Sequence, residues 1–121
     1  MEERRRFVRL DTRLPVTYRV LPSTEAKQSV TKDIGGGGVC LFVNDPLKPG
    51  TQLQVDIKLP DQERPIGFTG EVVWCEQYEV IGKTQRDRAV EAGIKFLQID
   101  PQNQQAMMRY VILSLQPHRT R

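Results

Sequence analysis

The chain has 121 residues, of which 38% are hydrophobic and 27% charged, enough for one domain with a modest core. Its net charge of +3 is concentrated in residues 1–20, which hold six arginines and three carboxylates, whereas the other residues balance twelve basic against twelve acidic side chains. A general nucleic-acid binder usually spreads its basic side chains over one face, and no apolar run here approaches the roughly 18 residues of a membrane span. We therefore expect a cytoplasmic protein with no nucleic-acid partner and no membrane insertion.

The first feature along the chain is an arginine cluster, Arg4-Arg5-Arg6-Phe7-Val8-Arg9. Guanidinium groups bind phosphate oxygens bidentately and stack on flat bases. We expect residues 1–12 to form a flexible arginine-rich arm that meets a compact anion. Taken alone, the cluster is equally compatible with a solvated tail.

Period-two alternation of apolar residues then predicts six strands. Leu14, Val16, Tyr18 and Val20 share one face of the first, and the others cover residues 28–34, 39–43, 51–59, 66–80 and 89–99. In the long strand 66–80, Trp74 falls at a period-two position. That position is typical of a core residue, or of a stacking platform if the ring faces a ligand.

Between the second and third predicted strands lies Asp33-Ile34-Gly35-Gly36-Gly37-Gly38. A glycine-only turn lets a ligand approach the backbone closely, and the neighbouring carboxylate accepts hydrogen bonds from ligand N–H groups. A hairpin turn capped by Asp33 is the structural alternative. Together with the arginine cluster, the turn predicts a site for a small anionic ligand with a purine face.

The end of the chain changes to helical periodicity. Asp100 is a plausible N-cap and Pro101 a first helical residue, so we expect one helix over 101–115 and a tail over 117–121. Six strands and a terminal helix predict a single domain in which an antiparallel barrel or sandwich, residues 13–99, packs against the helix.

The sequence gives little support for an enzymatic function. The single histidine, His118, lies in the expected tail, and no nucleophile, phosphate-loop or metal-ligand motif is present. Cys40 and Cys75 lack the spacing of a metal or redox pair, and we expect them to be small buried hydrophobic residues. We predict no catalytic residue, no metal and no cofactor.

The chain resembles the PilZ domain family, whose members are bacterial receptor modules for the second messenger cyclic di-GMP. The family signature RxxxR is similar to Arg5–Arg9, and (D/N)xSxxG is similar to Asp33–Gly38. Gly70-Glu71-Val72-Val73-Trp74 and Gly93-Ile94-Lys95-Phe96 resemble later strands of the family. The resemblance implies a mainly β fold, a six-stranded antiparallel split barrel with one C-terminal helix.

The resemblance also implies roles for the matching residues. Arg5 and Arg9 would bracket the phosphates and the Hoogsteen edge of guanine, and Asp33 would accept from the N1–H and N2–H₂ groups. Gly38 would leave room for the base or backbone, and Trp74 would add a stacking surface.

Two positions modify this reading. Arg4, directly before RxxxR, resembles family members that bind an intercalated pair of ligands. Gly35 replaces the serine of the second signature, which removes about one hydrogen bond, or roughly 0.5–1.5 kcal/mol.

The implied function is a stand-alone receptor and adaptor that changes conformation with cyclic di-GMP and signals to an unidentified downstream protein. Motility, exopolysaccharide synthesis and pilus control are all compatible processes. The alternative is a degenerate PilZ domain that acts as a protein-interaction module without ligand. A barrel for single-stranded nucleic acid is the weakest reading, because only 7% of the residues are aromatic.

Overall fold

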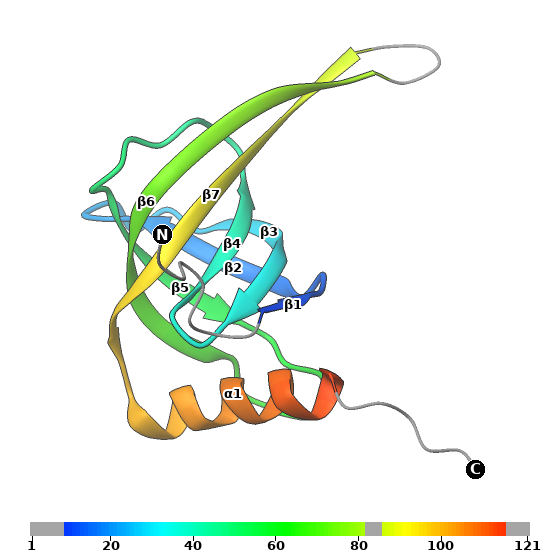
Figure 1. The fold of residues 1–121 in the computed structure, drawn as a ribbon. Coiled ribbons are helices and arrows are strands. Elements are labelled where there is room, and N and C mark those ends of the chain that lie inside the picture. The colour runs from blue at the N-terminus through cyan, green and yellow to red at the C-terminus, as the bar shows by residue number, and fades with distance from the viewer. Residues whose placement is uncertain (1–8, 82–85, 116–121) are drawn as a thin grey trace, which may run out of the picture.

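The computed structural model describes residues 9–81 and 86–115, which form a barrel of long strands closed at one end by a helix (Figure 1). The elements are β1 (Arg9–Asp11), β2 (Pro15–Val20), β3 (Lys27–Gly35), β4 (Gly38–Val43), β5 (Gln52–Ile57), β6 (Ile66–Ile81), β7 (Arg86–Ile99) and α1 (Pro101–Leu115).

All strand pairings are antiparallel, and the sheet closes on itself. The order is β1-β3-β2-β5-β6-β7-β4, and an additional pairing of β3 with β4 joins the two sides. Six strands therefore form a closed barrel, with β1 as a short extra strand on β3. The predicted six-stranded antiparallel barrel with one C-terminal helix is confirmed.

The alternation seen in the sequence places the core inside this barrel. In β5, for example, Leu53, Val55 and Ile57 are fully buried, whereas the residues between them are partly or largely exposed. Successive side chains of a strand point to opposite faces, so one face of each strand fills the barrel and the other meets solvent. The long β6–β7 hairpin projects beyond the barrel (Figure 1), and its side chains Tyr78 and Ile81 are exposed.

Strand β1 corrects one boundary of the sequence prediction. The expected arm extended to residue 12, but Arg9, Leu10 and Asp11 pair with Gly35, Ile34 and Asp33 of β3. Three residues carry too little hydrophobic periodicity to be recognised as a strand, and their pairing depends on partners 22 to 26 residues away. The pairing fixes Arg9 beside the glycine turn.

A β-bulge in β6 turns Trp74 to the outer face and so decides between the two positions that the sequence left open for this residue. The register with β7 shifts between Val72 and Trp74, so Val73 is an extra residue in the ladder. One extra residue moves every later side chain to the other face. Val72 therefore lies in the core, and Trp74 lies on the outside with 41% of its surface exposed.

The helix begins as the sequence predicts. The Asp100 carboxylate accepts a hydrogen bond from the Gln102 amide at 2.9 Å, which is the N-cap arrangement, and Pro101 is the first helical residue. Met107 and Val111 pack into the barrel core, and the helix contacts β1, β3 and β6. Ile112, Leu113 and Leu115 are exposed.

Within residues 9–81 and 86–115, no helix is both long enough and apolar enough to cross a membrane. Cys40 is buried, Cys75 is half-buried, and both thiols are free.

Thr31 connects the start of the barrel to β3. Its side chain is fully buried, its hydroxyl accepts a hydrogen bond from the Leu14 amide at 2.9 Å, and it donates to the Thr12 carbonyl. The Thr31 amide in turn donates to the Leu14 carbonyl. Thr31 therefore forms hydrogen bonds with the backbone amide and carbonyl groups between β1 and β2, next to the strand that carries Arg9.

We predict that Thr31→Val lowers the free energy of unfolding by about 1–3 kcal/mol, because the isosteric side chain leaves a buried amide and carbonyl without partners. Urea unfolding monitored by circular dichroism measures the change. The control is Thr17→Val at a half-buried position of β2, for which we expect a change within about 0.5 kcal/mol. Equal stability of the two variants would contradict the role given to Thr31.

Candidate functional site

The strand register aligns four residues of the predicted site and its surroundings on the outer face of the barrel. Asp33 of β3 pairs with Cys40 of β4, Cys40 pairs with Gly93 of β7, and Gly93 pairs with Trp74 of β6. Directly paired residues share a face of the sheet. Two of the four, Asp33 and Trp74, were predicted as ligand residues, and the pairing brings them to the same row.

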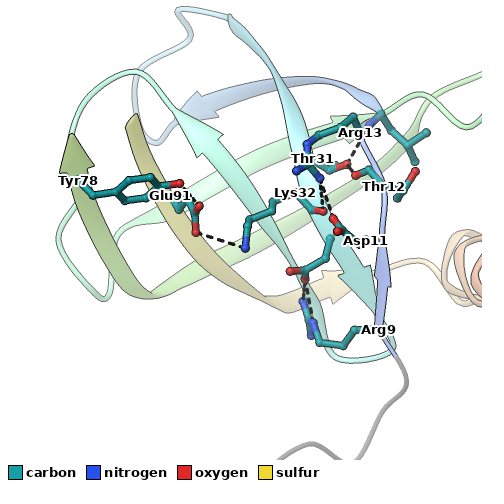
Figure 2. A network of polar contacts seen from close by, with 10 residues as sticks. Arg9, Asp11, Thr12, Arg13, Thr31, Lys32, Tyr78 and Glu91 are labelled. Carbon is teal, nitrogen blue, oxygen red and sulfur yellow. Dashed lines mark hydrogen bonds and ion pairs between the residues drawn. The ribbon is translucent and has the colours of Figure 1, made fainter. Parts of the chain in front are cut away.

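Arg9 and Asp33 form an ion pair at one end of this row. The Arg9 Nε donates to Asp33 Oδ1 at 2.8 Å, and Nη2 donates to the same oxygen at 2.5 Å. The two side chains remain 26% and 25% exposed. Charge-assisted bonds of this kind orient both groups, so the carboxylate and guanidinium are held together where a ligand can reach them (Figure 2 shows Arg9).

Trp74 lies against the backbone of Gly93 at the other end. A Cβ at Gly93 would be 2.2 Å from Trp74 Nε1 and 2.4 Å from Cε2. The indole therefore occupies the space that any larger residue at this position would need. Because the ring is also partly exposed, it offers an apolar surface beside the pocket.

A pocket of about 360 Å³ lies between these two ends. Its walls come from β1, β3, β4, β6 and β7 and from the glycine turn. The lining residues are Arg9, Asp33, Gly37, Gly38, Val39, Cys40, Val73, Trp74, Gly93, Ile94 and Lys95. The volume is within the roughly 300–1,000 Å³ of small-molecule sites.

The other predicted residues have different positions. Gly35 is buried and pairs with Arg9 at the end of β3, but it does not line the pocket. Gly38 lines the pocket, and a Cβ there would be 2.0 Å from the Ile94 carbonyl oxygen. Its small size is thus required by the close approach of β4 to β7. Arg4 and Arg5 lie outside the described residues.

Two larger pockets lie near α1, but they lack the charged and aromatic residues of the predicted site. One of about 1100 Å³ follows the helix and is lined largely by glutamines and apolar side chains, and one of about 640 Å³ lies between the helix start and β6. Neither contains Arg9, Asp33 or Trp74. We therefore assign the site to the smaller pocket, in which opposite charges and an aromatic ring converge.

A polar network extends from the pocket along the outer face. Lys32 Nζ lies 3.9 Å from Glu91 Oε1, and the Tyr78 hydroxyl donates to Glu91 Oε2 (Figure 2). Glu91 is only 7% exposed, so these two groups compensate a largely buried carboxylate. The hydrogen bond to Glu91 is the main cause that raises the pKa of Tyr78.

Cys40 forms part of the pocket base. Burial, followed by the nearby Asp33 and Glu91 carboxylates, raises the pKa of its thiol from 9.0 to about 12. A thiol with such a pKa stays protonated at neutral pH and is a poor nucleophile. In the described ranges, no group of three or more His, Cys, Asp or Glu side chains has the arrangement of a metal site.

The sequence prediction did not include several residues that line the pocket, among them Cys40, Gly93 and Lys95. Alternation with the buried residues Ala92 and Ile94 does indicate that Gly93 and Lys95 face outward. The sequence does not indicate that β7 lies next to β4, since that neighbour relation joins strands about 50 residues apart. Cys40 has a position next to the turn but no chemical signal of its own.

The PilZ domain model matches residues 3–113, nearly the whole chain. The chain belongs to the PilZ domain family. A search of curated protein sequences gave no match.

Solved structures share the fold of this PilZ domain. The Bacillus subtilis inhibitor of motility MotI/DgrA is 26% identical with a TM-score of 0.70; the alignment covers 93% of this chain and 52% of that one. The PilZ domain of Escherichia coli YcgR with cyclic di-GMP has 17% identity, a TM-score of 0.74, and 92% and 91% coverage. The K. pneumonia MrkH–cyclic di-GMP complex has 17% identity, a TM-score of 0.72, and 94% and 52% coverage. The chain thus spans about half the length of MotI and MrkH.

We predict that Gly93→Ala displaces the indole of Trp74, because its Cβ would overlap three ring atoms. Trp74 is the only tryptophan, so its emission and its quenching by acrylamide report on this contact directly. We expect a red-shifted emission and a larger quenching constant than in the parent protein. Gly67→Ala on β6, where the new Cβ would meet the flexible Asp56 carboxylate, is the control and should leave both signals unchanged. An unchanged spectrum in Gly93→Ala would contradict the packing.

The Cys40 thiol predicts how stability depends on pH. Since its pKa is about 12 in the folded state against 9.0 ordinarily, the unfolded chain loses this proton first, and folding stability falls as pH rises above 9. The contribution is up to about 1.4 kcal/mol for each pH unit. We expect Cys40→Ala to show a shallower decline than the parent protein between pH 8 and 10 in urea unfolding. Parallel curves for Cys40→Ala and the parent would contradict this assignment.

Proposed function

We propose that this PilZ domain is a receptor for cyclic di-GMP, which binds in the outer pocket between Arg9 and Trp74. The observation that carries the proposal is the convergence of Arg9, Asp33, Gly38 and Trp74, which come from four different strands, on one pocket. The YcgR PilZ domain and MrkH, which share this fold, were both solved with cyclic di-GMP. PilZ domains act as receptors and adaptors and not as enzymes, and we extend that role to this chain.

The Arg9–Asp33 pair retains capacity for a guanine base. A guanidinium has five N–H donors, and two of those of Arg9 are used on Asp33. The remaining donors can bind O6 and N7 of guanine or a phosphate oxygen. An ionised carboxylate offers about four acceptor sites, so Asp33 can still accept from the N1–H and N2–H₂ groups. The ion pair thus presents free donors and free acceptors side by side.

Trp74 supplies the stacking surface in this proposal. Stacking of a base on an aromatic side chain contributes about 1–3 kcal/mol. Because Gly93 holds the indole flat against β7, little rotamer entropy is lost when a base covers it.

The arginine arm completes the site. Arg5 would bind the phosphates with Arg9, and Arg4 would recruit a second, intercalated ligand, so that two molecules bind each domain. Gly35 lacks the hydroxyl of the family signature, and we expect this to lower affinity by a few-fold to about tenfold without abolishing binding.

Ligand binding would order the arm against the barrel and create a surface for a partner protein, an order–disorder switch. We place this signalling in the cytoplasm, with an unidentified downstream protein as the target. The second candidate, a degenerate domain that binds partners without ligand, is favoured by Gly35 and opposed by the intact Arg9–Asp33 pair.

The test is calorimetric titration of the purified protein with cyclic di-GMP. We expect saturable binding with a stoichiometry near two, a loss of about tenfold or more in Trp74→Ala and in Asp33→Asn, and no detectable heat in the Arg5→Ala, Arg9→Ala double variant. The matched control is Arg64→Ala, an exposed arginine between β5 and β6 that does not line the pocket.

A parent protein that releases no heat and shows no thermal shift at high ligand concentration would overturn the receptor proposal. A constitutive interaction module would then be the better description. A stoichiometry of one would remove the role given to Arg4 and leave the receptor in place.

A further inference from the structure

Lys95 lines the same pocket, although no signature of the family contains it as a ligand residue. It lies on β7, where it pairs with Gly38 of β4 on one side and with Glu71 of β6 on the other. The neighbouring Ile94 is buried in the core and Lys95 is exposed. Its side chain is therefore on the outer face, which also carries the Arg9–Asp33 pair and Trp74.

The register places Lys95 and Arg9 at the two ends of one row. Arg9 pairs with Gly35 of β3, and Lys95 pairs with Gly38 of β4. The β3–β4 ladder includes the pair Ile34–Val39, which is directly next to these two glycines. Three strand spacings of about 4.8 Å put the two backbones roughly 14 Å apart. The glycines between them carry no side chain, so along this row no side chain separates Arg9 from Lys95.

The charged side chains of the pocket differ in whether they already have a partner of opposite charge. Among the residues that the structure describes, the charged ones lining this pocket are Arg9, Asp33 and Lys95, and Arg9 is already bound to Asp33. Among the described residues, Lys95 has no ion pair within 4.0 Å, although Glu71 lies opposite it on β6. The described lining residues therefore sum to a charge of about +1, and Lys95 carries the charge that none of these residues compensates.

We propose that Lys95 is a phosphate-binding residue of this site, which contacts a phosphodiester of bound cyclic di-GMP from the side opposite the arginine arm. The inference rests on the proposed function. Cyclic di-GMP is a dianion, and two cations on opposite sides of a flat glycine surface match two separated phosphates better than one arginine cluster does. An ammonium group on a flexible stem acts as a point charge and needs no bidentate geometry. Lys95 would thus offset part of the affinity lost with the missing hydroxyl at Gly35.

The experiment compares Lys95→Gln with Lys48→Gln, which removes the same charge from the exposed β4–β5 connection outside this pocket. Calorimetric titrations with cyclic di-GMP at several NaCl concentrations give the affinity and its salt dependence. We expect Lys95→Gln to bind about three- to tenfold more weakly, with a flatter dependence of log Kd on log salt. Lys95→Arg should keep most of the affinity and the full salt dependence, and Lys48→Gln should match the parent. Equal melting temperatures verify that the folds are intact.

The outcomes separate the two proposals. If the parent binds the ligand but Lys95→Gln matches Lys48→Gln in affinity and salt dependence, the role of Lys95 is overturned and the receptor function remains. If Lys95→Gln weakens binding while its salt dependence stays that of the parent, Lys95 acts through packing and not through its charge, which also overturns the proposal. If the parent itself does not bind, both proposals fail.

Discussion

The antiparallel register of β3, β4, β7 and β6 is the constraint on which the described site depends. It places Asp33, Cys40, Gly93 and Trp74 in one row across four strands, although they are separated by up to 60 residues along the chain. A shift of one residue in any of these ladders would turn the outward-facing side chains of that strand into the core. The closed barrel prevents such a shift, because the alternating core residues of every strand would have to leave the interior together.

Two local irregularities shape the part of this regular frame that borders the candidate pocket. The bulge at Val73 turns Trp74 outward, and the shift between Thr31 and Asp33 leaves Lys32 as an extra residue beside Asp33 on β3. Both occur in strands that border the pocket, where bulges commonly redirect side chains. The glycines at positions 38 and 93 have the complementary role, since each allows a neighbouring group to approach closer than a Cβ would permit.

The electrostatics of the pocket combine a neutralised pair with one available cation. Arg9 and Asp33 compensate each other, so the protein does not carry the cost of an isolated charge on a partly buried surface. Glu91 is compensated in the same way by Tyr78 and Lys32 a short distance along the face. Cys40 stays neutral because burial raises the pKa of its thiol, and the Asp33 and Glu91 carboxylates raise it further. A dianionic ligand in this pocket would meet an Arg9–Asp33 pair whose two groups are already oriented by each other.

The sequence by itself determined the barrel strands, the capped start of α1 and the two short motifs with their chemical types, because alternation, capping and turn preferences are local properties. It also indicated Arg9, Asp33 and Gly38 as site residues, which the structure brings to one pocket, while that assignment as a ligand site stays a prediction. Only the tertiary structure decided that β1 pairs with the glycine end of β3, that Trp74 faces outward, and that Lys95 shares the pocket. These features depend on ladders between strands distant in sequence, and a single extra residue in such a ladder reverses a face without leaving a local signal.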